Sequence, residues 1–129
     1  MFTDLGFRVK FSEESTRETY YKGQSTIPSD TVCYPAKLMH GHIQSLLDQK
    51  VDFIFYPCMS YNLDEGDSDN HFNCPVVAYY PELLKANVSA LADFDFMMPY
   101  FELADKKHFT KHAVKYFCGK YPQLSLIHI

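Results

Sequence analysis

The chain has 129 residues, which is enough for one domain. Its apolar share of 47%, with 10 tyrosines and 11 phenylalanines, is typical of a packed globule and excludes a disordered chain. A net charge of -4 gives no support for a nucleic-acid partner, and the sequence shows neither a membrane-length apolar run nor a secretory signal, so we expect a cytoplasmic protein.

Hydrophobic periodicity predicts a first strand at residues 7–11, where apolar and polar residues alternate. A short helix is expected at residues 16–22, with polar residues before it and Gly23 at its end. A second helix should begin near Pro35, because proline is tolerated in the first turn. Gly41 either weakens this helix or permits a close approach. The expected buried face of the second helix consists of Ala36, Met39, Ile43, Leu46 and Leu47.

The second half of the chain alternates short apolar runs with helical patterns. This alternation predicts an α/β layered fold, Rossmann-like or flavodoxin-like, with a mainly parallel sheet of about four strands flanked by helices. A polar loop is expected at residues 58–73. The other expected elements are strands at residues 51–56, 75–79 and 94–98 and helices at residues 81–90 and 106–117.

Three of the four cysteines lie where predicted elements begin or end. Cys33 precedes the second helix, Cys58 follows the 51–56 strand, and Cys74 precedes the 75–79 run. Sites in parallel sheets lie beyond the carboxyl ends of strands, so thiols at element ends could meet there. A thiol at a helix N-terminus is also biased toward the thiolate, which is the form that binds iron. The alternative is that each cysteine is a small buried hydrophobe, because no C-x2-C pair is present.

Other polar residues have weaker patterns. Lys37 and His40 share a helical face beyond Cys33, where a cation could stabilise an anionic cluster or an acyl-CoA phosphate, although a solvated face is the simpler interpretation. His42 and His71 are of a metal-binding residue type, but lone histidines are more often polar surface. Residues 64–70 resemble a calcium loop in composition, but the glycine offset is wrong and no glutamate closes the loop, which favours a solvated acidic loop.

Several strings resemble a known family. SDTVCYPAKLMHGHI, DFIFYP and NCPVV, together with the opening LGFRVKFSEES, are similar to the activase-associated segment of the CoA-substrate-specific enzyme activases. These are long proteins related to the activator and component subunits of the 2-hydroxyacyl-CoA dehydratases of anaerobes. The resemblance covers about residues 5–120, which is most of the chain.

The resemblance implies an iron–sulfur electron-transfer module of an acyl-CoA dehydratase activase or dehydratase-like protein. It implies a [4Fe-4S] cluster bound by Cys33, Cys74 and Cys58, and no catalytic residues in this stretch. The expected partners are an ATP-dependent activator domain and dehydratase-like domains of the same full-length chain. Two alternatives remain open: a structural or docking domain without a cluster, and a cysteine-based zinc module.

The last six residues are expected not to belong to the natural protein. Residues 124–129, LSLIHI, resemble the translation of a transposon-end adapter used in sequencing libraries. We therefore expect a single α/β domain at residues 1–123, belonging to a much longer protein, followed by a non-native tail.

Overall fold

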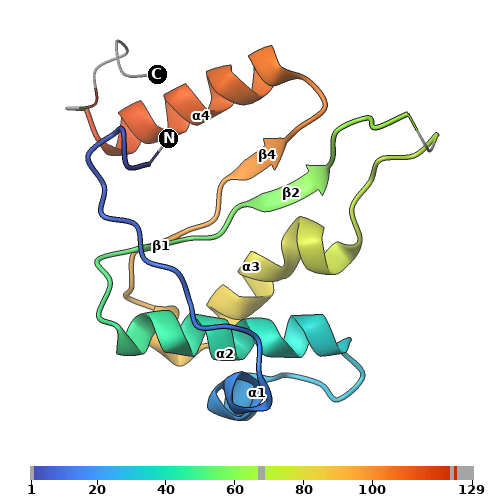
Figure 1. Ribbon diagram of the computed structural model, residues 1–129, viewed down its shortest axis with the longest axis vertical. Helices are drawn as coiled ribbons and strands as arrows, with labels where there is room; N and C mark the ends of the chain where they lie inside the picture. The colour runs from blue at the N-terminus through green and yellow to red at the C-terminus, as the bar shows by residue number, and fades with distance from the viewer. Residues whose placement is uncertain (1, 67–68, 123, 125–129) are drawn as a thin grey trace. The chain divides into compact units, whose positions relative to one another are not determined.

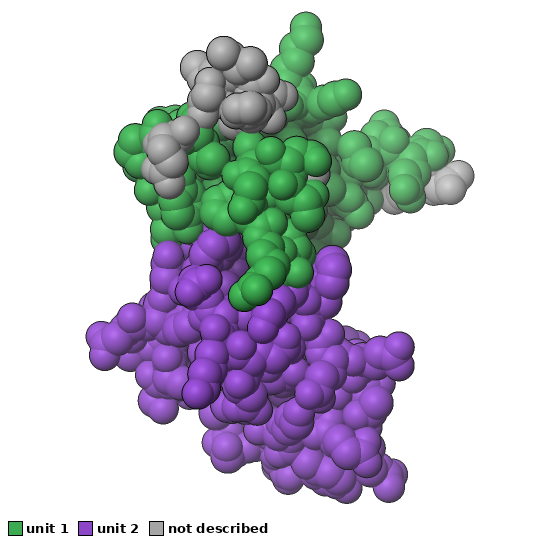
Figure 2. Space-filling view, turned by 60° about the vertical axis from the view of Figure 1, so that its left-hand side comes forward, with its two compact units in different colours: residues 1–9, 57–79, 99–129 green, residues 10–56, 80–98 purple. Residues whose placement is uncertain are grey.

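The computed structural model describes residues 2–66, 69–122 and 124 (Figure 1). These residues form two compact units, each built from separated segments of the chain (Figure 2). Unit 1 contains residues 1–9, 57–79 and 99–129, and unit 2 contains residues 10–56 and 80–98. The polypeptide passes from one unit to the other four times, after residues 9, 56, 79 and 98.

In unit 2, α1 (Arg17–Gly23) crosses α2 (Tyr34–Asp48) at very short range. Thr16 begins α1 with a capping box, in which its hydroxyl accepts from the backbone N–H of Thr19. A Cβ atom built on Gly41 would lie 1.7 Å from the backbone oxygen of Thr19, so only glycine permits this crossing. Of the two roles left open for Gly41, the structure shows the close approach. A 3-10 turn, η1 (Gln24–Thr26), follows α1.

The sheet of unit 2 is very small. β1 (Ile54–Phe55) pairs in parallel with β3 (Phe96–Met97), with Ile54 opposite Phe96. The 3-10 turn η2 (Ser89–Leu91) precedes β3. The unit encloses an apolar core that also contains one histidine. Its buried residues include Ala36, His40, Ile43, Ile54, Tyr80, Leu84, Val88, Leu91, Phe96 and Met97, and the hydroxyl residues Thr19 and Ser45 are buried as well.

Unit 1 combines a second parallel pair with the last helix. β2 (Cys58–Tyr61) pairs with β4 (Tyr100–Glu102), and α4 (Lys106–Lys120) lies alongside β4 (Figure 1). The ring of Phe101 on β4 contacts the ring of Phe109 on α4, with centroids 5.2 Å apart. The start of the chain also packs on α4, because the rings of Phe2 and Phe117 have centroids 5.6 Å apart.

α3 (Pro75–Asn87) contributes to both units, with residues 75–79 in unit 1 and residues 80–87 in unit 2. Cys74 precedes it, and the Cys74 carbonyl accepts hydrogen bonds from the N–H groups of Val77 and Ala78, both at 2.9 Å. The strand expected at residues 75–79 is therefore wrong. Proline suits the first turn of a helix, and Tyr80 and Leu84, four residues apart on one face of it, are both buried.

The α/β class and the parallel pairing of strands are confirmed, whereas the four described strands form two separate two-stranded sheets in place of one layer. The helices expected at residues 16–22, near Pro35 and at 106–117 are confirmed as α1, α2 and α4. Residues 7–11 form no strand: Phe7 is half-buried against the rings of Phe2 and Tyr121, whereas Val9 and Phe11 are exposed, Phe11 to 84%. The loop expected at residues 58–73 contains β2.

Within the described residues, no helix has both the length and the apolar character needed to span a bilayer.

Candidate functional site

Cys33 lies at the N-terminal end of α2, as the sequence predicts. It is the N-cap residue, its backbone is extended (φ -60°, ψ 153°), and its side chain makes no capping hydrogen bond. The residue is exposed, and Pro35 occupies the first turn that follows it. The sulfur atom is therefore accessible beside the positive end of a 15-residue helix, where the helix dipole favours a negative charge.

The second feature of unit 2 is a buried hydrogen-bond network on α2 and α3. His40 lies two helical turns after Cys33 and is only 1% exposed. Its Nδ1 lies 2.8 Å from the hydroxyl of Thr26, and its Nε2 lies 3.0 Å from the hydroxyl of Tyr80. The interpretation of residues 37 and 40 as a solvated face is wrong for His40, because α3 covers it. Lys37 is half-buried and donates to the carbonyl of Asp30 at 2.8 Å.

The partners of His40 define its tautomer. Thr26 donates its hydroxyl proton to the carbonyl of Gly23 at 2.9 Å, so the same hydroxyl accepts from Nδ1–H of His40. Nε2 is then the acceptor for the Tyr80 hydroxyl. Burial lowers the pKa of His40 and raises the pKa of Tyr80, and negative charge on Cys33 raises the Tyr80 pKa further. The network therefore keeps a neutral imidazole and a neutral phenol.

The other two expected ligands lie in unit 1 and differ in exposure. Cys74 is exposed and precedes the first turn of α3, so it too stands at a helix N-terminus. Cys58 is 0% exposed, and it begins β2, with its N–H donating to the carbonyl of Pro99 at 2.9 Å. The segments that carry these cysteines are adjacent, because the N–H of Asn73 donates to the carbonyl of Ser60 at 2.9 Å.

The structure does not assemble the expected ligands into one group within a unit. Cys33 belongs to unit 2, and Cys58 and Cys74 belong to unit 1. None of the four cysteines forms a disulfide. Across the described part of the chain, no group of three or more His, Cys, Asp or Glu side chains is placed to bind a metal ion. Cys118, near the end of α4, is partly buried, and its sulfur lies 3.8 Å from the carbonyl of Leu124.

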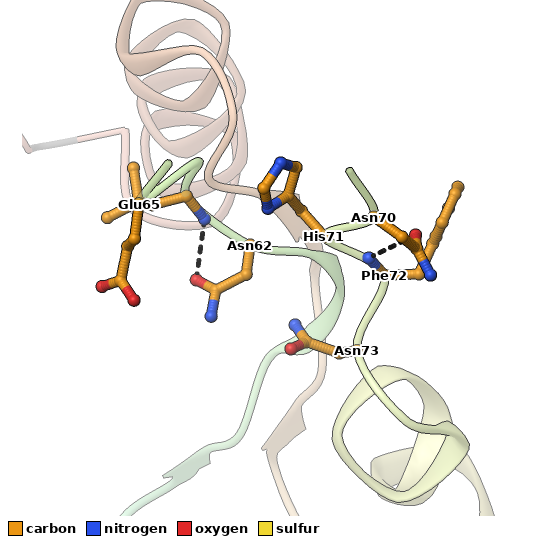
Figure 3. A pocket seen from close by; sticks show the side chains of 7 residues that line it. Asn62, Glu65, Asn70, His71, Phe72 and Asn73 are labelled. Atoms are coloured by element: carbon orange, nitrogen blue, oxygen red, sulfur yellow. Dashed lines mark hydrogen bonds between the residues drawn. The ribbon is translucent and has the colours of Figure 1, made fainter. Parts of the chain in front are cut away.

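Unit 1 also has a polar pocket of about 230 Å³ between the segment after β2 and the segment before α3 (Figure 3). Much of its polar lining holds the loop together. The side-chain oxygen of Asn62 accepts from the N–H of Leu63 at 2.9 Å, that of Asn70 accepts from the N–H of Phe72 at 3.2 Å, and the Asn73 amide donates to the carbonyl of Met59 at 2.8 Å. Besides the three asparagines, the pocket is lined by Leu63, Glu65, His71 and Phe72, and the His71 ring lies 3.5 Å from the Asp64 carboxylate.

Comparison with known families decides the affiliation. A family model described as the CoA enzyme activase uncharacterised domain matches residues 1–124. The chain belongs to the CoA enzyme activase family. This confirms the resemblance that the cysteine-containing strings carry. No curated protein and no solved structure matches the chain.

Two aspects of this activase-family domain escape sequence reasoning. The His40–Tyr80 hydrogen bond joins residues 40 positions apart, and a helix face alone does not identify the partner. The burial of Cys58 depends on pairing between β2 and β4, which the polar composition of the following loop conceals. The position of Cys33 at a helix start is local, and the proline after it was a sufficient signal.

Proposed function

We propose that this CoA enzyme activase family domain is an iron–sulfur electron-transfer module of an acyl-CoA dehydratase activase or dehydratase-like protein. The observation that supports this function is the placement of Cys33 and Cys74. Both residues are exposed and stand at helix N-termini, where a helix dipole stabilises a nearby negative charge such as that of a bound cluster. Such thiols are suited to iron, which binds cysteine as the thiolate.

The third expected ligand fits less well. Cys58 is fully enclosed, so its sulfur would reach a [4Fe-4S] cluster only after residues around the start of β2 move. Cys33 and Cys74 are therefore the stronger candidates, and further ligands would come from Cys58 after such a movement or from another domain. A bound cluster would supply one-electron transfer, and the domain would hold it, with an ATP-dependent activator domain and dehydratase-like domains as partners in the cytoplasm.

The test is purification under strictly anaerobic conditions, followed by reconstitution with iron and sulfide. The parent chain should acquire iron, acid-labile sulfide and the broad visible absorption of a cluster. Cys33→Ser and Cys74→Ser should each lower the iron content, whereas Cys118→Ser, whose thiol lies at the opposite end of a helix, should not. A parent chain that stays colourless and free of iron would exclude cluster binding by this domain alone.

A second candidate is a structural or docking domain of the same multidomain protein. The complete burial of Cys58 favours it, because an enclosed thiol in a strand is a normal packing group. In the full-length protein, a domain of this kind would retain partner activity when Cys33 and Cys74 are both replaced by serine. A zinc module is the remaining alternative, and it predicts zinc without iron after metal-controlled purification.

A further inference from the structure

Two histidines on α4 lie side by side and take no part in the proposed cluster site. His108 and His112 are four residues apart, which places them on the same face of the helix. Their ring centroids are 4.1 Å apart, and the ring planes are inclined by 43°. Both side chains are exposed. A cation can therefore approach both rings from solvent without any opening of the fold.

We propose that His108 and His112 form a chelating site for a divalent transition-metal cation such as Zn²⁺ or Ni²⁺. Imidazole nitrogen is a preferred ligand of these ions, and a metal–nitrogen bond is about 2.0–2.1 Å long. Two nitrogens bound to one ion are thus at most about 4 Å apart. The observed ring separation brings the imidazoles within that range, so small rotations of the side chains suffice.

The backbone under the two histidines is well fixed. Asp105 caps α4, with its carboxylate accepting from the N–H groups of Lys107 at 2.7 Å and His108 at 3.3 Å. Ala113 and Phe117 are buried and anchor the helix in unit 1. A chelate on a rigid helix binds more tightly than two independent histidines, because the second ligand is already positioned when the first binds.

The neighbouring charges lower the affinity. Lys111 and Lys115 each follow one of the histidines by three residues, so they lie on the same side of α4. Their positive charges oppose a cation, although both side chains are exposed and their effect is screened by solvent. No third His, Cys, Asp or Glu joins the pair among the described residues, which leaves coordination positions for water or for a ligand supplied by another molecule.

The test is a zinc titration of the full 129-residue chain, with the imidazole ring protons of its histidines followed by NMR. The His108 and His112 signals should move together along one binding curve. In the double variant His112→Ala/Thr110→His, the number of histidines is unchanged, but the two imidazoles no longer share a helical face. This variant should bind zinc at the helix at least about tenfold more weakly than the parent chain does. Lys111→Gln should bind more tightly than the parent chain.

The site-specific readout separates this proposal from the cysteine site. Zinc bound at thiols would leave the two ring signals unmoved and would overturn the proposal, as would two rings that respond with unrelated midpoints. Equal zinc affinity at α4 in the parent and the double variant would also overturn it. Circular dichroism of the double variant should retain the helical signal of the parent. If the double variant loses that signal, the single variants His108→Asn and His112→Asn are used in its place. Each leaves the rest of α4 unchanged and should show the same loss of zinc affinity.

Discussion

Two glycines in unit 2 control how closely α1 approaches α2. The two glycines Gly23 and Gly41 face each other across the crossing, and a Cβ on Gly23 would lie 2.2 Å from the backbone nitrogen of Gly41. Since backbone atoms cannot move aside as a flexible side chain does, an added methyl group has to separate the helices.

Gly41→Ala should therefore lower the free energy of unfolding by about 3 kcal/mol, because the new methyl group would overlap the backbone of Thr19. Urea denaturation followed by circular dichroism measures the change. Gly119→Ala is the matched control, since Gly119 is also helical but has no atom within 4 Å of an added Cβ. The control should be neutral or stabilising by up to about 1 kcal/mol. Equal losses in both variants would contradict the close crossing.

The second prediction concerns acidification. The pKa of His40 is lowered by burial, so between this value and its ordinary value of 6.5 the unfolded chain binds a proton that the folded chain does not. Stability is then complete above about pH 6.5 and falls as the pH decreases through this interval. Urea unfolding at about pH 7.5 and about pH 5.5 should show the loss. His40→Gln should reduce this pH dependence, whereas the exposed-ring variant His108→Gln should retain it.

At this scale, sequence reasoning located Cys33 from the proline in the first turn of α2, but it left two roles open for Gly41, because the contact with Thr19 belongs to another helix. It did not foresee that His40 is buried, because the covering residue Tyr80 belongs to a segment expected to lie between a strand and a helix. For Cys58, it left two roles open, a cluster ligand and a small buried hydrophobe. The burial of Cys58 accompanies the pairing of β2 with β4, whose partners are about 40 residues apart. Long-range contacts of this kind leave no local signal.

Among the elements, the helices with a clear local start signal agree best with expectation. α1 has its capping box at Thr16, α2 has a proline in its first turn, and α4 has Asp105 as its N-cap. α3 is the exception, because the Pro75–Tyr79 run is rich in β-branched and aromatic residues, and because Pro81 interrupts the helical hydrogen bonds. Tertiary burial of Ala78 and Leu84 outweighs these local preferences.

The cap of α4 gives a third prediction. Asp105→Ala removes the acceptor for two backbone N–H groups and should lower the free energy of unfolding by about 1 kcal/mol. Asp105→Asn keeps a side-chain oxygen in the same position, and its loss should be clearly smaller. Thermal denaturation followed by circular dichroism compares the two variants. If the asparagine variant loses as much stability as the alanine variant, the effect comes from the charge of Asp105 and not from capping.

For the molecule as a whole, the division into two units gives each its own buried residues. Leu84 lies in unit 2, and Phe117 lies in unit 1. Leu84→Ala should remove about 2–5 kcal/mol and Phe117→Ala about 3–5 kcal/mol of packing free energy. Amide hydrogen exchange should show the loss of protection mainly in the unit that carries the substitution. An equal loss across both units in both variants would show that they unfold as one.

The segment boundaries of the two units also set an order of events on the ribosome. Every residue of unit 2 has been synthesised once residue 98 is added, so this unit can close while the remaining chain is still being translated. Unit 1 closes later. Phe2 and Phe7 contact the rings of Phe117 and Tyr121, so the segment at residues 1–9 can pack in this way only after residue 121 has been synthesised.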